Sequence, residues 1–141
     1  MEWMLMPLRR YADFSGRSRR KEYWMFLLFE IIVIFGVILL FGTLGALGDT
    51  AENGQSPASI IAGGLMGLLF LAIILGFMVP RLAVTVRRLH DVDKSGWFMF
   101  ISLVPLIGPI VLLIFLCTEG TKGENRYGPN PKGENIADVF A

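Results

Sequence analysis

Two long, nearly uninterrupted apolar stretches, at residues 23–47 and 60–86, limit what this chain can fold into. At about 1.5 Å per residue of helix, each is long enough to cross a hydrocarbon core of about 30 Å. Hydrophobic residues make up 54% of the 141-residue chain, which is more than a soluble domain of this size covers with polar surface. We therefore predict two transmembrane helices in an all-α membrane protein. A cleaved signal peptide is the alternative for the first stretch, although the apolar region of such a peptide has only about 7–15 residues.

A third apolar segment, residues 97–116, barely reaches spanning length. Pro105, Gly108 and Pro109 interrupt it near its middle, where proline removes a backbone donor and glycine weakens a helix. A kinked span and a re-entrant hairpin both fit this pattern. We expect the kinked span first, because each arm of a hairpin is too short to cross the bilayer. The predicted architecture is a small helical bundle of three hydrophobic segments.

Residues 1–22 precede the first span and mix spaced apolar residues with cations. Trp3, Leu8 and Tyr11 recur at roughly helical spacing, which is typical of a short helix lying at the membrane interface. An irregular arm with aromatic anchors is the alternative, because the segment is too short for its period to decide. We predict a short interfacial helix within this arm.

The distribution of charge predicts an orientation. Six Lys and Arg residues lie in residues 1–22, none in the loop 48–59, and four in residues 81–96. Basic residues collect on the cytoplasmic side of bacterial membrane proteins, so we expect a cytoplasmic amino-terminal arm, a periplasmic loop at 48–59 and a cytoplasmic loop at 87–96. The Gly- and Pro-rich tail, residues 117–141, holds three basic and four acidic residues. Its side therefore stays open: a third span makes it periplasmic, and a hairpin leaves it cytoplasmic.

Composition excludes several kinds of partner and site. The net charge of +1 gives no indication of a nucleic-acid partner. Cys117 is the only cysteine and His90 the only histidine, so no Cys/His set is available for a zinc site, and we expect neither metal nor cofactor. Gly63 and Gly67 have the spacing of a helix-packing motif. They serve either a homo-oligomer or membrane-partner face, or packing against the chain's own helices, which we favour.

Two polar strings flank the predicted cytoplasmic ends of the first two spans: FSGRSRRKEYW at residues 14–24 and RRLHDVDKSGW at residues 87–97. Because one span begins and the other ends on the same side, we expect side chains of the two strings to meet. Such a cluster could bind anionic lipid headgroups through its arginines, dock a protein partner, or consist of interfacial salt bridges that support the topology. The candidate residues are Arg17, Arg20, Glu22, Arg87, Arg88, His90 and Asp91.

The working hypothesis for this cluster is a lipid- or protein-binding adaptor without enzymatic activity. It predicts that charge reversal of Arg87 and Arg88 abolishes capture of the ligand while membrane insertion persists. An enzyme would use His90 as a base and Asp91 to orient it, but no nucleophile or metal set accompanies this pair. We therefore rank a membrane enzyme below the adaptor.

Two further polar features stand apart from the cluster. Glu30 lies about two helical turns into the apolar phase, where a carboxylate is costly. It indicates a proton relay or interhelical bond in a small channel or transporter component, or a side chain that is protonated or reaches water. In the tail, the string GTKGENRYGPNP at residues 120–131 places Asn125, Arg126 and Tyr127 among turn formers. We expect a compact turn packed against the end of the bundle rather than a recognition site for a partner.

These three strings, in this order and separated by hydrophobic segments, resemble the bacterial family catalogued as domain of unknown function 805. The resemblance runs from Trp3 to Pro131. It implies a multi-pass protein of the bacterial inner membrane, and it carries over no catalytic residues. The interruption at Pro105, Gly108 and Pro109 also resembles the third hydrophobic segment of the family.

Overall fold

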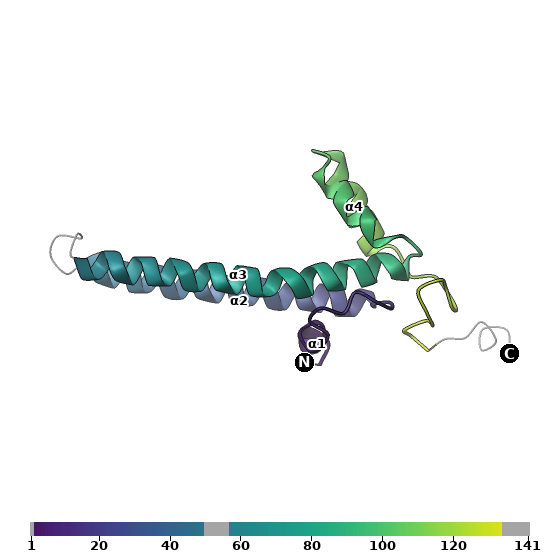
Figure 1. Ribbon diagram of the computed structural model, residues 1–141, viewed down its shortest axis with the longest axis horizontal. Helices are drawn as coiled ribbons and strands as arrows, with labels where there is room; N and C mark the ends of the chain where they lie inside the picture. The colour runs from purple at the N-terminus through teal and green to yellow at the C-terminus, as the bar shows by residue number, and fades with distance from the viewer. Residues whose placement is uncertain (1, 50–56, 134–141) are drawn as a thin grey trace. The chain divides into compact units, whose positions relative to one another are not determined.

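The computed structural model describes residues 2–49 and 57–133, and these residues form helices joined by short connections (Figure 1). No strand is present in this part of the chain. The predicted all-α class is therefore confirmed. The elements are α1 (Glu2–Arg9), α2 (Arg20–Asp49), α3 (Pro57–Asp91), the 3-10 helix η1 (Gly96–Leu103) and α4 (Ile107–Cys117).

Two of these helices, α2 and α3, are long and apolar enough to cross a membrane. The matching segments are Arg20–Gly45 and Gly63–Asp91, and only 11% and 22% of their apolar windows are buried inside the protein. The core helix of a soluble protein buries most of such a surface, because exposed apolar area is unfavourable in water. The exposure of α2 and α3 therefore agrees with lipid as their surroundings.

The chain divides into two units, which we describe separately. The paired-helix unit, Leu28–Met78, contains the carboxyl-terminal part of α2 and the amino-terminal part of α3. The rings of Phe29 and Phe77 lie 5.9 Å apart and those of Phe41 and Phe70 lie 6.4 Å apart. The residue numbers of the contacting rings increase along α2 and decrease along α3, so the two helices are antiparallel. Glu30 is buried in this unit at 5% exposure.

The small-residue motif of α3 does not contact the rest of the described chain. A Cβ atom built at Gly63 or at Gly67 meets no atom within 4 Å. Within residues 2–49 and 57–133, the motif therefore does not pack against the chain's own helices, which is the interpretation that we favoured. A face for a second copy or another membrane protein stays a prediction.

The terminal unit contains the chain from Met1 to Leu27 and from Val79 to Ala141, of which residues 2–27 and 79–133 are described. It includes α1, which agrees with the short helix predicted in the amino-terminal arm. The segment expected as a loop at 87–96 begins instead inside α3, because the helix continues to Asp91. The predicted loop at 48–59 belongs in part to α2 and α3, and its residues 50–56 lie outside the described residues.

The third apolar segment forms two short helices that pack on each other, rather than the single kinked helix that we expected first. The break lies between η1 and α4, where Leu106 adopts a φ of 67°. Gly108 lies so close to η1 that a Cβ atom there would be 1.9 Å from the carbonyl oxygen of Ile101. With 11 residues, α4 is about 16 Å long. The arrangement is a helical hairpin, and its re-entry into the membrane, the alternative weighed from the sequence, stays a prediction.

Candidate functional site

Two consecutive arginines at the carboxyl-terminal end of α3 organise the terminal unit. Arg87 and Arg88 are both fully buried. Successive residues of a helix point about 100° apart, so the two guanidinium groups reach different parts of the chain. Burial of a cation is tolerated only when it is paired and hydrogen-bonded. Both arginines are paired with a buried carboxylate, although Nε of Arg87 has no hydrogen-bond partner among the described residues.

Arg87 joins α3 to the amino-terminal arm and to α2. Its Nη2 lies 3.1 Å from Oε1 of Glu22, which is also buried. Its Nη1 donates to the carbonyl oxygen of Asp13 at 3.0 Å. The backbone N–H of Ser18 donates to the carbonyl of Arg87 at 3.1 Å. The arm is therefore held against the end of α3 by side-chain and backbone bonds together.

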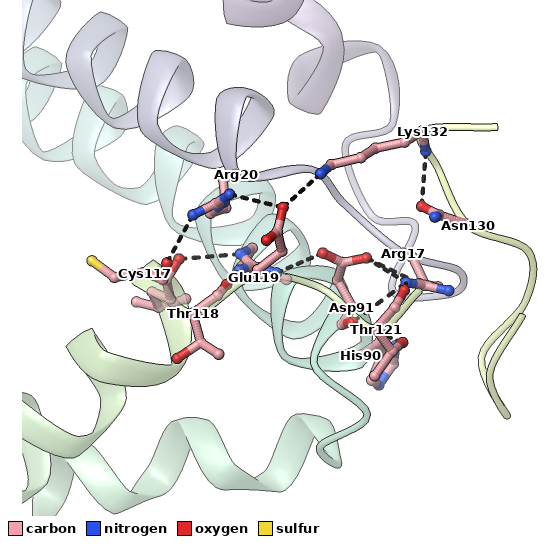
Figure 2. Close-up of polar contacts among 12 residues, drawn as sticks. Arg17, Arg20, His90, Asp91, Cys117, Thr118, Glu119, Thr121, Asn130 and Lys132 are labelled. Carbon is pink, nitrogen blue, oxygen red and sulfur yellow. Dashed lines mark hydrogen bonds and ion pairs between the residues drawn. The ribbon is translucent and has the colours of Figure 1, made fainter. Parts of the chain in front are cut away.

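Arg88 joins α3 to the tail and shares the carboxylate of Asp91 with Arg17; Figure 2 shows Arg17 beside Asp91. Nη1 of Arg88 donates to Oδ2 of Asp91 at 2.7 Å, and Nε of Arg17 donates to Oδ1 of the same carboxylate at 3.0 Å. Arg88 also donates to the carbonyl oxygens of Leu116 and Thr118, at the end of α4. Asp91 thus lies between two buried cations that come from distant parts of the sequence.

The tail after α4 is folded onto this network by backbone groups. Arg17 donates to the carbonyls of Thr121 and Gly123, at 2.6 and 2.7 Å. The backbone N–H of Thr121 donates to the carbonyl of Asp91 at 2.9 Å. Gly120 passes so close that a Cβ atom would lie 2.1 Å from Oδ2 of Asp91. The tail therefore requires glycine at this position.

The predicted turn in the tail meets the same end of α3. The side-chain amide of Asn125 donates to the carbonyl of His90 at 2.9 Å. The ring of Tyr127 stacks on the imidazole of His90, with centroids 3.8 Å apart and planes 4° apart. Arg126 forms an exposed ion pair with Asp93 at 3.1 Å. The turn thus packs against the end of α3.

His90 and Asp91 have different partners. Nδ1 of His90 lies 3.2 Å from the carbonyl oxygen of Gly16, and since a carbonyl only accepts, Nδ1 carries the proton there. The Asp91 carboxylate is held by Arg17 and Arg88 instead. The geometry gives no support to a base with an orienting carboxylate at these two positions.

The carboxylate of Asp13 holds the loop that precedes Arg17. Asp13 accepts hydrogen bonds from the Ser15 hydroxyl and from Arg10. The Ser15 hydroxyl, followed by Arg10, holds the pKa of Asp13 well below its ordinary value. The carboxylate is therefore ionised at neutral pH, and the bonds it makes keep in place the backbone carbonyl that Arg87 uses.

Beside the buried ion pairs lies a basic pocket of about 410 Å³, which we call the cationic pocket. The start of α2 and the tail both contribute to it. Two acids also line it: Asp91, whose charge is matched within the network, and Glu119, which is exposed. Five cations exceed two carboxylates, so the pocket is positively charged. The cations are Arg19, Arg20, Lys21, Lys122 and Lys132.

The structure thus divides the predicted cluster into parts. Five of its seven residues form the buried network, namely Arg17, Glu22, Arg87, Arg88 and Asp91. His90 lies next to it against Tyr127, and Arg20 is exposed and lines the cationic pocket. Glu30 belongs to the paired-helix unit. Sequence reasoning missed Glu119, Lys122 and Lys132, because an exposed charge in a turn-rich tail carries no periodic signal.

The arrangement offers chemistry for anion binding. Among the described residues, no group of three or more His, Cys, Asp and Glu side chains is placed to hold a metal ion. Arginine and lysine side chains that are partly exposed and face a common pocket can instead receive phosphate or carboxylate groups. The buried arginines are already occupied by carboxylates and carbonyls, so the exposed cations carry this capacity.

Comparison with known proteins places the chain in a family. Residues 11–129 match the family described as protein of unknown function, DUF805. Inner membrane protein YhaI of Escherichia coli (strain K12) is 43% identical over 132 residues, which cover 94% of this chain and 97% of YhaI. Inner membrane protein YhaH of the same strain is 44% identical over 134 residues, covering 95% and 99% of the two chains. No solved structure matches the chain.

These matches bear on the predictions made from the three polar strings. The matched range contains both strings that build the buried network and nearly all of the tail turn. Both relatives are named as inner-membrane proteins, which agrees with the two apolar helices and implies association with a lipid bilayer. The chain therefore belongs to the DUF805 family, as the resemblance of its polar strings predicted.

Proposed function

We propose that this protein is a multi-pass inner-membrane adaptor whose cytoplasmic terminal unit binds anionic lipid headgroups in the cationic pocket. The observation that carries the proposal is the pocket itself, in which five cations outnumber two carboxylates. One of these carboxylates, Asp91, is already neutralised by Arg17 and Arg88. An anionic ligand would therefore find unmatched positive charge.

The proposed topology has two crossings, α2 and α3, and a re-entrant hairpin made of η1 and α4. Both ends of the hairpin lie at the end of α3: Gly96 contacts Val86, and the carbonyl of Thr118 accepts a bond from Arg88. A segment that starts and ends at one place does not cross the bilayer. The excess of cations in residues 1–22 and 81–96 supports a cytoplasmic location for the arm and, with it, for the tail.

Lipid headgroups are the ligand that this position favours. Arg19, Arg20 and Lys21 lie where α2 begins, and under the proposed topology this is the depth at which α2 enters the membrane. Tyr23 and Trp24 follow directly, with rings 5.4 Å apart in an edge-to-face contact, and such residues are typical of the membrane interface. Basic pockets at that depth bind the phosphates of anionic lipids.

Binding can be tested with the detergent-solubilised full chain and short-chain lipids. We expect dioctanoyl phosphatidylglycerol and dioctanoyl phosphatidic acid to bind more tightly than zwitterionic dioctanoyl phosphatidylcholine. The double variant Lys21→Glu/Lys122→Glu should lose this preference. Each single variant, Lys21→Glu or Lys122→Glu, has Arg9→Glu as its matched control, since Arg9 is an exposed cation of the same unit that does not line the pocket. Equal binding of all three lipids by the wild-type chain would contradict the proposal, as would capture of a cytoplasmic protein without any lipid preference.

A small channel or transporter component is the second candidate, and the burial of Glu30 favours it. This carboxylate is 5% exposed in α2, although only 11% of the apolar window of that helix is buried. Burial of an acid within a membrane helix is typical of functional positions. The candidate predicts proton flux in sealed proteoliposomes that is lost in Glu30→Gln. An absence of flux in the wild-type chain would eliminate it.

A further inference from the structure

We infer that Glu119 is an internal anion that occupies the place of a ligand phosphate in the cationic pocket, and that the pocket therefore selects phosphomonoester dianions over phosphodiester monoanions. The inference rests on the proposed function and names the ligand class. The shared chemistry is a terminal phosphate, carried either by a membrane lipid or by a soluble molecule.

The geometry of Glu119 is that of a bridging anion (Figure 2). A single oxygen, Oε1, lies 3.3 Å from Nη2 of Arg20 and 2.8 Å from Nζ of Lys132. These two cations come from the start of α2 and from the tail, and both line the pocket. One oxygen shared by two cations is the arrangement that a phosphate oxygen adopts between basic side chains.

Glu119 can leave this position, whereas the other acid of the pocket cannot. Its side chain is 57% exposed, and those of Arg20 and Lys132 are 44% and 41% exposed. Ion pairs with such exposure are weak and screened by water and salt. Asp91 is 7% exposed and paired with two buried arginines. If its carboxylate moved away, the two guanidinium groups would be buried without a counter-charge. An entering ligand thus competes with Glu119 alone.

The charge of the competitor sets the selectivity. A phosphodiester brings one negative charge and replaces the single charge of Glu119 with little electrostatic gain. A phosphomonoester brings about 1.5 to 2 negative charges at neutral pH and leaves the five cations better matched. The hydrogen bond from Lys132 holds the pKa of Glu119 below its ordinary value, so the competitor stays ionised at neutral and mildly acidic pH.

The test compares Glu119→Gln with a matched control, Glu124→Gln. Glu124 is an exposed acid of the same tail that does not line the pocket, so both variants change the net charge equally. The probes are dioctanoyl phosphatidic acid, a monoester, and dioctanoyl phosphatidylglycerol, a diester, together with inorganic phosphate. Dissociation constants are measured on the detergent-solubilised full chain, after circular dichroism has shown equal helicity for all variants.

We expect the wild-type chain to bind the monoester more tightly than the diester. Glu119→Gln should tighten the binding of both lipids by roughly twofold to fivefold, the change that corresponds to the loss of an exposed ion pair, because both lipids displace the same competitor. Glu124→Gln should shift both lipids equally and less. Inorganic phosphate that binds as tightly as phosphatidic acid would support the inference and assign the site to a soluble phosphate.

The two ways of failing are distinguishable. If neither anionic lipid nor phosphate binds to any form of the chain, the proposed function itself fails. If anionic lipids bind but Glu119→Gln and Glu124→Gln give the same constants, Glu119 is not a competitor and the inference is overturned while the proposed function stands. A wild-type chain that binds diester more tightly than monoester would also overturn it.

Discussion

Oδ1 of Asp91 lies 3.0 Å from Nε of Arg17, although 74 residues separate the two in the sequence. The second oxygen of the same carboxylate accepts from Arg88 at 2.7 Å. Through this one side chain the amino-terminal arm, the end of α3 and the tail are connected. The stability of the terminal unit is therefore expected to depend on Asp91 more than on any exposed charge.

Asp91→Asn should lower the free energy of unfolding of the terminal unit by about 3–5 kcal/mol, because it leaves two buried guanidinium groups without a counter-charge. Denaturant titration of the detergent-solubilised protein measures this. Asp93→Asn is the control: its carboxylate is half exposed and, within the described part of the chain, its ion pair is with the exposed Arg126, so a change of at most about 1 kcal/mol is expected. Equal losses in the two variants would contradict a structural role for the buried carboxylate.

Charge reversal of Arg87 should unfold the terminal unit rather than remove ligand binding alone. Arg87→Glu places a carboxylate beside buried Glu22, and two buried like charges repel each other without solvent to screen them. The prediction made from the sequence, that reversal of Arg87 and Arg88 abolishes capture of the ligand while membrane insertion persists, stays open beside this one. The swapped pair Glu22→Arg/Arg87→Glu should recover part of the stability. Limited proteolysis of the tail measures both, and a protease-resistant Arg87→Glu chain would show that the ion pair is dispensable.

Gly120→Ala should destabilise the fold of the tail by about 1–3 kcal/mol, as expected for an atom forced into a packed region. The added methyl would meet the Asp91 carboxylate at 2.1 Å and press it away from Arg17. Gly36→Ala in α2 is the matched control, because a Cβ atom there meets nothing within 4 Å. Amide hydrogen exchange of residues 118–128 reports the effect. Unchanged protection in Gly120→Ala would mean that the tail does not lie against Asp91.

The loop held by Asp13 should keep its structure until the pH falls below the ordinary pKa of an aspartate. The pKa of Asp13 is lowered in the folded chain, first by the Ser15 hydroxyl and then by Arg10, so its contribution to stability is present at and above its ordinary pKa. That contribution is lost only as the pH falls through the lowered value. Carbon-detected NMR of the Asp13 carboxyl should show titration below the ordinary range, and Ser15→Ala should move it upward. An ordinary pKa in the wild-type chain would rule out these bonds in solution.

The sequence predicted the two long apolar helices well because hydrophobic length is a one-dimensional signal. Residues 23–47 and 60–86 fall inside α2 and α3. Arg17 lies just before α2 and Asp91 at the end of α3, and the expectation that their two strings meet came from this order of strings and apolar segments. The last turn of α3 was missed because Arg87, Arg88 and Asp91 read as polar loop residues. In the structure their charges are matched, which lets a polar helical turn be buried.

The tail and the third apolar segment were harder to predict, for a physical reason. Whether residues 97–116 kink or fold back depends on the close approach of Gly108 to Ile101, and no local pattern encodes that contact. The place of Glu119, Lys122 and Lys132 depends in turn on where the hairpin returns the chain. Arg17 reaches the tail through the carbonyl oxygens of Thr121 and Gly123. Because every residue has a carbonyl group, the sequence does not indicate which of them Arg17 contacts.

The side of the membrane on which the tail lies tests the account most directly. The proposed hairpin and the bonds from Arg17 and Arg88 to the tail require residues 117–133 to be cytoplasmic, beside the arm. Fusions after Ala141 to green fluorescent protein, which fluoresces only inside the cell, and to alkaline phosphatase, which is active only outside, give opposite signals for the two sides. We predict bright fluorescence and no phosphatase activity. Phosphatase activity without fluorescence would mean that residues 97–116 cross the membrane, and it would contradict the assembly of the cationic pocket from both ends of the chain.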